Sequence, residues 1–201
     1  ATVTNQPLID KETRDVANAL HQSQPHLNKI KQDLQAVENS PSMQNLEKLD
    51  KMFDKSPMGK RVQAKGKDVA DFVQANVHVT QNPSRIQMDN NKIAIAENKL
   101  NQFKKVYGEA EQSHWGKKFE VATNNVLQSP QVANLKKDIK AFKASPQGQN
   151  VVRQVKELKD AYKHNVKTAD VPKRMQGLTT MAARYAPAVR YTVVYRPSHP
   201  T

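Results

Sequence analysis

The chain of 201 residues carries 32 lysine and arginine residues against 19 aspartate and glutamate residues, so its formal net charge is +13. With a mean hydropathy of −0.80, it contains no apolar stretch of the roughly 18 residues that a membrane-spanning helix requires. The lack of cysteine excludes disulfide scaffolds, thiol nucleophiles and iron–sulfur clusters, and six glycines leave little material for a glycine-rich phosphate loop.

The first forty residues show the spacing of a long amphipathic helix. Apolar and small side chains recur in steps of four and three at Ile9, Thr13, Val16, Leu20, Ser23, Leu27, Ile30, Leu34 and Val37. Because proline lacks the backbone N–H that a helix interior needs, Pro25 is expected to kink or divide this helix.

An internal repeat follows. The segment 40–62 aligns without a gap to the segment 129–151, at an offset of 89 residues, and 11 of the 23 positions are identical. Each copy contains two Ser-Pro pairs, at Ser40 and Ser56 in the first and at Ser129 and Ser145 in the second. Serine caps a helix and proline suits its first position, so we expect a helix to begin at each pair. The alignment indicates a tandem duplication.

The segment after the second Ser-Pro of each copy has an apolar stripe at near-heptad spacing. The same offset of 89 relates Val62, Gly66, Val69, Val73 and Val77 to Val151, Val155, Leu158, Tyr162 and Val166. Upstream of residue 129 the similarity fades, so the match between residues 87–128 and the first helix is topological only. The copies are expected to join near residues 81–84, and a continuous helix after Pro83 is an alternative.

The last thirty residues lie outside the repeat. Pro172 can open a short helix that reaches about Tyr185. Beyond it, Val189, Tyr191, Val193 and Tyr195 alternate with other side chains, as in a short strand. A single strand leaves its backbone unpaired, so it must pair with a partner chain, pack on the helices as an irregular arm, or stay mobile.

These elements predict an all-α protein made by tandem duplication of a three-helix unit. About six main helices would form an elongated helical bundle, with a short C-terminal helix and an extended basic arm. The expected divisions are a first repeat unit at 1–84, a second at 85–168, and the C-terminal helix and arm at 169–201.

Positive charge is concentrated in the second half of the chain. Residues 1–85 hold 12 basic and 10 acidic side chains, whereas residues 86–201 hold 20 and 9. The basic side chains form helical stripes and continue into the arm, where tyrosines accompany them. We expect the following to bind a partner: Lys136, Lys140, Lys143, Arg153, Lys156, Lys163, Lys167, Arg184, Arg190, Tyr191, Tyr195 and Arg196. A solvated surface without a partner is the alternative for each stripe.

No catalytic motif is present, and the six histidines lack the spacing of a metal site, so we expect neither enzyme activity nor a cofactor. The leading hypothesis is a non-enzymatic structural or binding protein whose basic C-terminal half engages an acidic protein partner or assembly. One alternative is a protein that binds nucleic acid or another polyanion. Another is a carrier with a cavity for a lipid or small apolar ligand near Phe103, Tyr107, Trp115 and Phe119. The sequence starts at Ala1, which is compatible with the processed form of an exported, organellar or virion protein and leaves the compartment open.

Overall fold

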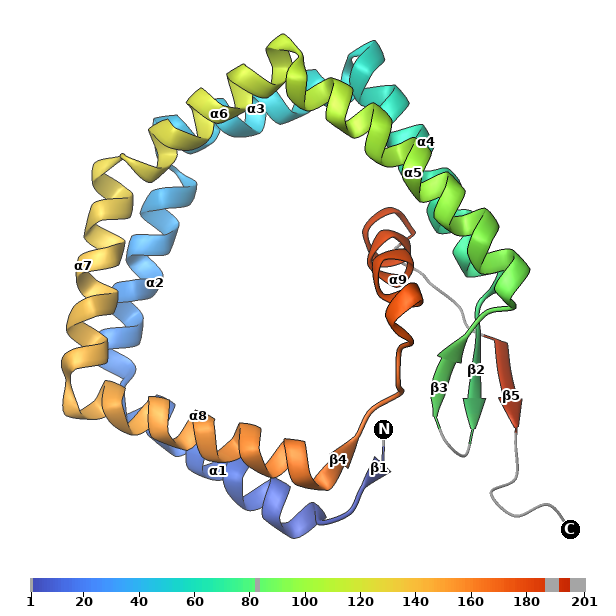
Figure 1. The fold of residues 1–201 in the computed structure, drawn as a ribbon. Coiled ribbons are helices and arrows are strands. Elements are labelled where there is room, and N and C mark those ends of the chain that lie inside the picture. The colour runs from blue at the N-terminus through green and yellow to red at the C-terminus, as the bar shows by residue number, and fades with distance from the viewer. Residues whose placement is uncertain (1, 82–83, 187–191, 196–201) are drawn as a thin grey trace, which may run out of the picture. The chain divides into compact units, whose positions relative to one another are not determined.

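The computed structural model describes residues 2–81, 84–186 and 192–195, and nine α-helices make up most of this part of the chain (Figure 1). The all-α class is thereby confirmed. The first copy contains α1 (Gln6–Gln22), α2 (Gln24–Glu38), α3 (Pro41–Lys55) and α4 (Pro57–Asn76). The second contains α5 (Asn90–Gln112), α6 (His114–Leu127), α7 (Pro130–Ala144) and α8 (Pro146–Asn165). The predicted C-terminal helix is α9 (Lys173–Tyr185).

Each copy has four helices where three were expected, because its long first segment is divided. Pro25 lies in the first turn of α2, and the chain turns at Ser23, which is fully buried and donates a hydrogen bond to the Ala19 carbonyl at 2.9 Å. In the second copy the break falls at Ser113, whose hydroxyl donates to the Ala110 carbonyl at 2.6 Å. A buried serine therefore marks the division in the first copy and a partly buried one in the second.

The four Ser-Pro pairs begin helices, as predicted. Each serine hydroxyl accepts a hydrogen bond from the backbone N–H three residues later, for example from Gly59 to Ser56 and from Gly148 to Ser145, both at 3.0 Å. Each also donates to a carbonyl of the preceding helix. At both glycines an added Cβ would lie less than 2 Å from the carbonyl oxygen of Phe53 or Phe142. The two copies thus share one tight connection that only glycine fits.

The helices divide into two compact units, each of which draws on both copies. Unit 1 comprises residues 1–49 and 119–167, and unit 2 comprises residues 50–118 and 168–201. This grouping follows contacts in space, whereas the expected division at residues 84 and 168 follows the sequence repeat. The latter stays a prediction about how the two copies arose.

In unit 1, helices of the first copy pack against helices of the second. α1 lies along α8 and α2 along α7 (Figure 1). β1 (Thr2–Val3) precedes α1 and pairs antiparallel with β4 (Val166–Lys167), which follows α8.

A small core in unit 1 is built from equivalent positions of the two copies. Its buried and partly buried members are Val37, Val126, Met43, Val132, Leu46 and Leu135. These are three pairs of residues at the repeat offset of 89, so each copy contributes the same three positions. Ser40 and Ser129, also at this offset, are 2% and 6% exposed. The copies therefore pack against each other through equivalent surfaces.

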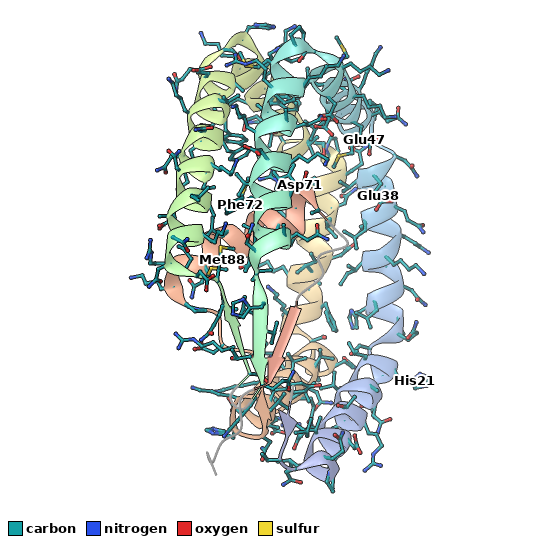
Figure 2. All side chains as sticks on the ribbon, turned by 90° about the vertical axis from the view of Figure 1, so that its right-hand side faces the viewer. His21, Glu38, Glu47, Asp71, Phe72 and Met88 are labelled. Carbon is teal, nitrogen blue, oxygen red and sulfur yellow. The ribbon has the colours of Figure 1, made fainter. Side chains whose placement is uncertain are left out.

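Unit 2 repeats this pairing and adds a cover. α4 packs against α5, and α9 packs mainly against α4. The core includes Val69, Val73, Met175 and Leu178, none of which is exposed. Met88 lies at the base of α5, where the helices meet a β-hairpin (Figure 2).

The hairpin consists of β2 (His78–Gln81) and β3 (Arg85–Gln87), which pair antiparallel. It occupies the predicted join between the copies, where a continuous helix was the alternative. This pairing corresponds to that of β1 with β4. β3 precedes the first helix of the second copy as β1 precedes that of the first, and β2 follows the last helix of the first copy as β4 follows that of the second.

The predicted C-terminal strand is present in part. β5 (Thr192–Tyr195) pairs in parallel with β2, so the sheet order is β3-β2-β5. The described part of the arm, Thr192–Tyr195, therefore pairs with a strand of the same chain, which differs from the three arrangements expected from the sequence. Residues 187–191 lie outside the described residues.

Candidate functional site

The basic stripes predicted on α7 and α8 both belong to unit 1 and face solvent. Six members lie on these helices, whereas Lys167, expected on the same helix, lies just beyond it in β4. All seven are exposed, and none forms an ion pair with a described acid: Lys136, Lys140, Lys143, Arg153, Lys156, Lys163 and Lys167. The single acid of α7, Asp138, does not neutralise them. Its carboxylate turns towards α2, is 12% exposed, and lies 3.3 Å from the Lys29 ammonium. We call these seven cations the α7–α8 stripe.

The counterpart positions of the first copy carry a different charge. They are occupied by Glu47 (labelled in Figure 2), Lys51, Asp54, Ala64, Lys67, Gln74 and His78. Two acids, two lysines and three side chains counted as uncharged give a net charge of zero at pH 7, against +7 in the second copy. Helix caps and apolar positions are shared between the copies, so the fold does not require the extra charge.

The remaining residues predicted to bind a partner belong to unit 2 or lie outside the described residues. Arg184 belongs to unit 2, where its guanidinium lies 5.7 Å from the centre of the Tyr185 ring. Arg190, Tyr191 and Arg196 lie outside the described residues. Tyr195 is in β5, and its side chain also falls outside the described part.

Of the four aromatic residues proposed to line an apolar cavity, three lie against other aromatic side chains. Phe103 is 6% exposed and lies 5.6 Å from the Tyr185 ring and 5.7 Å from Tyr107. Trp115 meets Phe53 edge to face at 5.5 Å. The fourth, Phe119, belongs to unit 1 and is only partly buried.

A pocket of about 480 Å³ opens elsewhere, in unit 2, where β3 meets the first turns of α5 and α9. Three basic side chains line it, but two of them are already paired. Arg85 lies 3.6 Å from Asp170, and Arg174 forms a close ion pair with Glu97, which lowers the pKa of that carboxyl. Only Lys173 remains to attract an anion, so the pocket offers much less charge than the α7–α8 stripe.

A pair of carboxyl groups joins α2 to α7. A hydrogen bond between Asp33 and Asp138 raises the pKa of Asp33, helped by desolvation, and lowers the pKa of Asp138. The Lys29 ammonium also favours the charged form of Asp138. The pair joins two helices of unit 1, so we assign it a structural role.

No group of three or more potential metal ligands occurs among residues 2–81, 84–186 and 192–195. Within those same ranges, no helix is both long enough and apolar enough to cross a bilayer.

Two exposed apolar side chains of α8 lie beside its cations and were not predicted from the sequence. Tyr162 was expected in a packed stripe, as the counterpart of the fully buried Val73, but it is 47% exposed. Val152, which no pattern singled out, is 59% exposed. Its distance of ten residues from Tyr162 places both on one side of the helix, and this spacing was the available signal.

Comparison with known proteins gives no relative: no family model matches the chain, and no curated protein or solved structure is significantly similar to it.

Proposed function

We propose that this is a non-enzymatic binding protein that engages an acidic protein partner through the α7–α8 stripe. The observation that supports this proposal is the difference between the two copies. At the seven stripe positions the side chains carry no net charge in the first copy, whereas in the second copy all seven are cations without an ion pair to a described acid. Charge that the fold does not need, and that repels itself, is retained at a cost in stability unless a partner neutralises it.

The arrangement of the cations supports a partner that is itself acidic. Lys136, Lys140 and Lys143 follow one side of α7 at steps of four and three, and the α8 members follow the next helix in the same unit. Attraction of this kind steers the encounter and weakens as salt screens it. The scaffold in this proposal is the pairing of the copies, which fixes α7 and α8 against α2 and α1.

The test compares two triple variants with the same change in net charge. Lys136→Glu, Lys140→Glu and Lys143→Glu reverse the α7 part of the stripe. Lys48→Glu, Lys51→Glu and Lys55→Glu reverse three exposed lysines of the counterpart helix α3, which form no ion pair with any described acid.

Binding of labelled poly-L-glutamate is measured by fluorescence anisotropy at low and moderate salt. The proposal expects the α7 variant to lose about tenfold or more in affinity, while the α3 variant stays near the parent protein. Equal losses in both variants would mean that net charge alone drives binding, and the proposal would fail.

Nucleic acid is the second candidate, and the continuity of the cations over two consecutive helices favours it. A polyphosphate chain would follow such a row and release counterions on binding. For a single-stranded oligonucleotide, the slope of log affinity against log salt should then approach about 0.7 times the number of contacted phosphates. Preference for the oligonucleotide over poly-L-glutamate at equal salt would select this candidate.

A further inference from the structure

The two copies show what one face of α4 and α8 can bind, because this face is covered in one copy and open in the other. On α4 the face is formed by Gly66, Ala70, Val73 and Val77, which are all buried. The ring of Tyr185, at the end of α9, rests on Gly66, so that an added Cβ would lie 2.6 Å from it. α9 is an amphipathic helix that docks along α4.

The counterpart face of α8 has the same helical spacing, but among the described residues no helix covers it as α9 covers α4. At the repeat offset its residues are Val155, Lys159, Tyr162 and Val166, and Val152 extends it by one turn. Val152 and Tyr162 are 59% and 47% exposed, and Lys159 is exposed as well. We call these five residues the α8 seam. Spacing of three and four residues is that of a helix that packs against another helix.

The seam differs from the equivalent face of α4 in that it contains a charged residue, and this charge determines which kind of helix can cover it. Lys159 stands in the middle of it, where α4 has Ala70, and Lys156 and Lys163 flank it. A helix that covered the seam with apolar side chains alone would strip water from the Lys159 ammonium without pairing it, which is costly. An acidic side chain in the covering helix removes this cost.

We infer that the α8 seam is the docking site for an acidic amphipathic helix of a partner protein. The inference rests on the proposed function and specifies the partner. Tyr162 and Val152 would enter the apolar face of that helix, as anchors do in helix-in-groove recognition, and the lysines would meet its acids.

The α9 helix of a second copy does not fit this seam. It carries Lys173, Arg174 and Arg184 and no acid, so its charges would repel those of α8. Val155 also occupies the position where Gly66 leaves room for Tyr185. The occupant is therefore a different protein with acidic side chains.

The test uses a synthetic helix with leucine at its seam positions, glutamate at its flanks, and one glutamate placed to face Lys159. The comparison ligand is poly-L-glutamate of equal charge, which has no apolar face. Binding of both is measured for the parent protein, for Val152→Ser with Tyr162→Ser, and for the control Val121→Ser. Val121 is a surface valine of α6 in the same unit, 60% exposed.

We expect the parent to bind the helix about tenfold more tightly than poly-L-glutamate, and the seam variant to lose this advantage while it still binds poly-L-glutamate. Val121→Ser should change neither affinity. Equal affinity for the two ligands, or a helix affinity unchanged in the seam variant, would overturn the inference and leave the proposed function standing.

Two other results are distinguishable. Binding of neither ligand to the parent protein would refute the proposed function itself. Binding to vesicles of phosphatidylcholine and phosphatidylserine that depends on Tyr162, without binding of the helix, would place a membrane surface at the seam and overturn the assignment to a protein partner.

Discussion

Truncation of two valines tests whether the two copies pack through equivalent surfaces. Val37 and Val126 are counterparts in the core of unit 1, at 8% and 6% exposed, and both contact the same small cluster. Val→Ala removes two buried methyl groups, worth about 1.6 kcal/mol at ~0.8 kcal/mol each. The cavity left behind brings the expected loss in unfolding free energy to about 2 kcal/mol for either variant. That loss corresponds to a fall of about 4–8 °C in Tm for a chain of this size.

Urea unfolding followed by circular dichroism measures both variants. Packing through equivalent positions predicts that the two losses agree within about 0.5 kcal/mol. The double variant should depart from additivity because the two sites share one cluster. Val121→Ala, at an exposed position, should change stability by less than about 0.5 kcal/mol. A large loss in one variant with none in its counterpart would refute packing through equivalent positions.

Two further changes test unit 2 and the contact between α2 and α7. Gly66→Ala should lower the unfolding free energy by about 1 kcal/mol because the Tyr185 ring must move. Gly108→Ala should raise it by about 1 kcal/mol, because the added Cβ would have no packing neighbour within 4 Å. A gain in stability in both variants, measured by thermal unfolding, would contradict the packing of α9. Asp33 has a raised pKa in the folded state, so its contribution is full below its ordinary pKa and is lost as the pH rises through the raised value. The unfolding free energy of Asp33→Asn should therefore exceed that of the parent protein at neutral pH, and the difference should shrink on acidification. A difference that grows on acidification would contradict the hydrogen bond between Asp33 and Asp138.

Local signals in the sequence predicted most of the helices. A serine followed by proline satisfies early backbone N–H groups and fixes the first turn, so Ser40, Ser56, Ser129 and Ser145 located four helix starts. These starts depend on residues within three positions of one another. The repeat was visible for the same reason, because the connections between helices impose glycine, serine and proline at set positions.

The pairing of helices depends on distant residues and was not predictable from this spacing. A stripe such as Val151, Val155, Leu158 and Tyr162 shows that a helix packs on one side, but not which helix it meets. The strands were harder to find because β2 and β3 are only four and three residues long. The exposure of Tyr162 was missed because the sequence does not show that α9 packs on α4, which buries the counterpart residue Val73.

The candidate site was predictable in part. The charge difference between the halves of the chain pointed to α7 and α8, and the seven cations are exposed and unpaired with any described acid. The structure adds that the two copies form the same series of helices, so that each cation can be compared with the residue at the equivalent position of the other copy. That comparison separates charge needed for folding from charge available for binding.

The most direct test of this account installs the residues of the first copy at the seven stripe positions of the second. Lys136→Glu, Lys143→Asp, Arg153→Ala, Lys163→Gln and Lys167→His install the counterpart residues, while Lys140 and Lys156 already match theirs. The variant should unfold within about 1 kcal/mol of the parent protein, since the changes are at exposed positions. Its affinity for poly-L-glutamate should fall by about tenfold or more. An affinity equal to that of the parent, or a variant that no longer folds, would contradict the claim that this charge serves binding and not the fold.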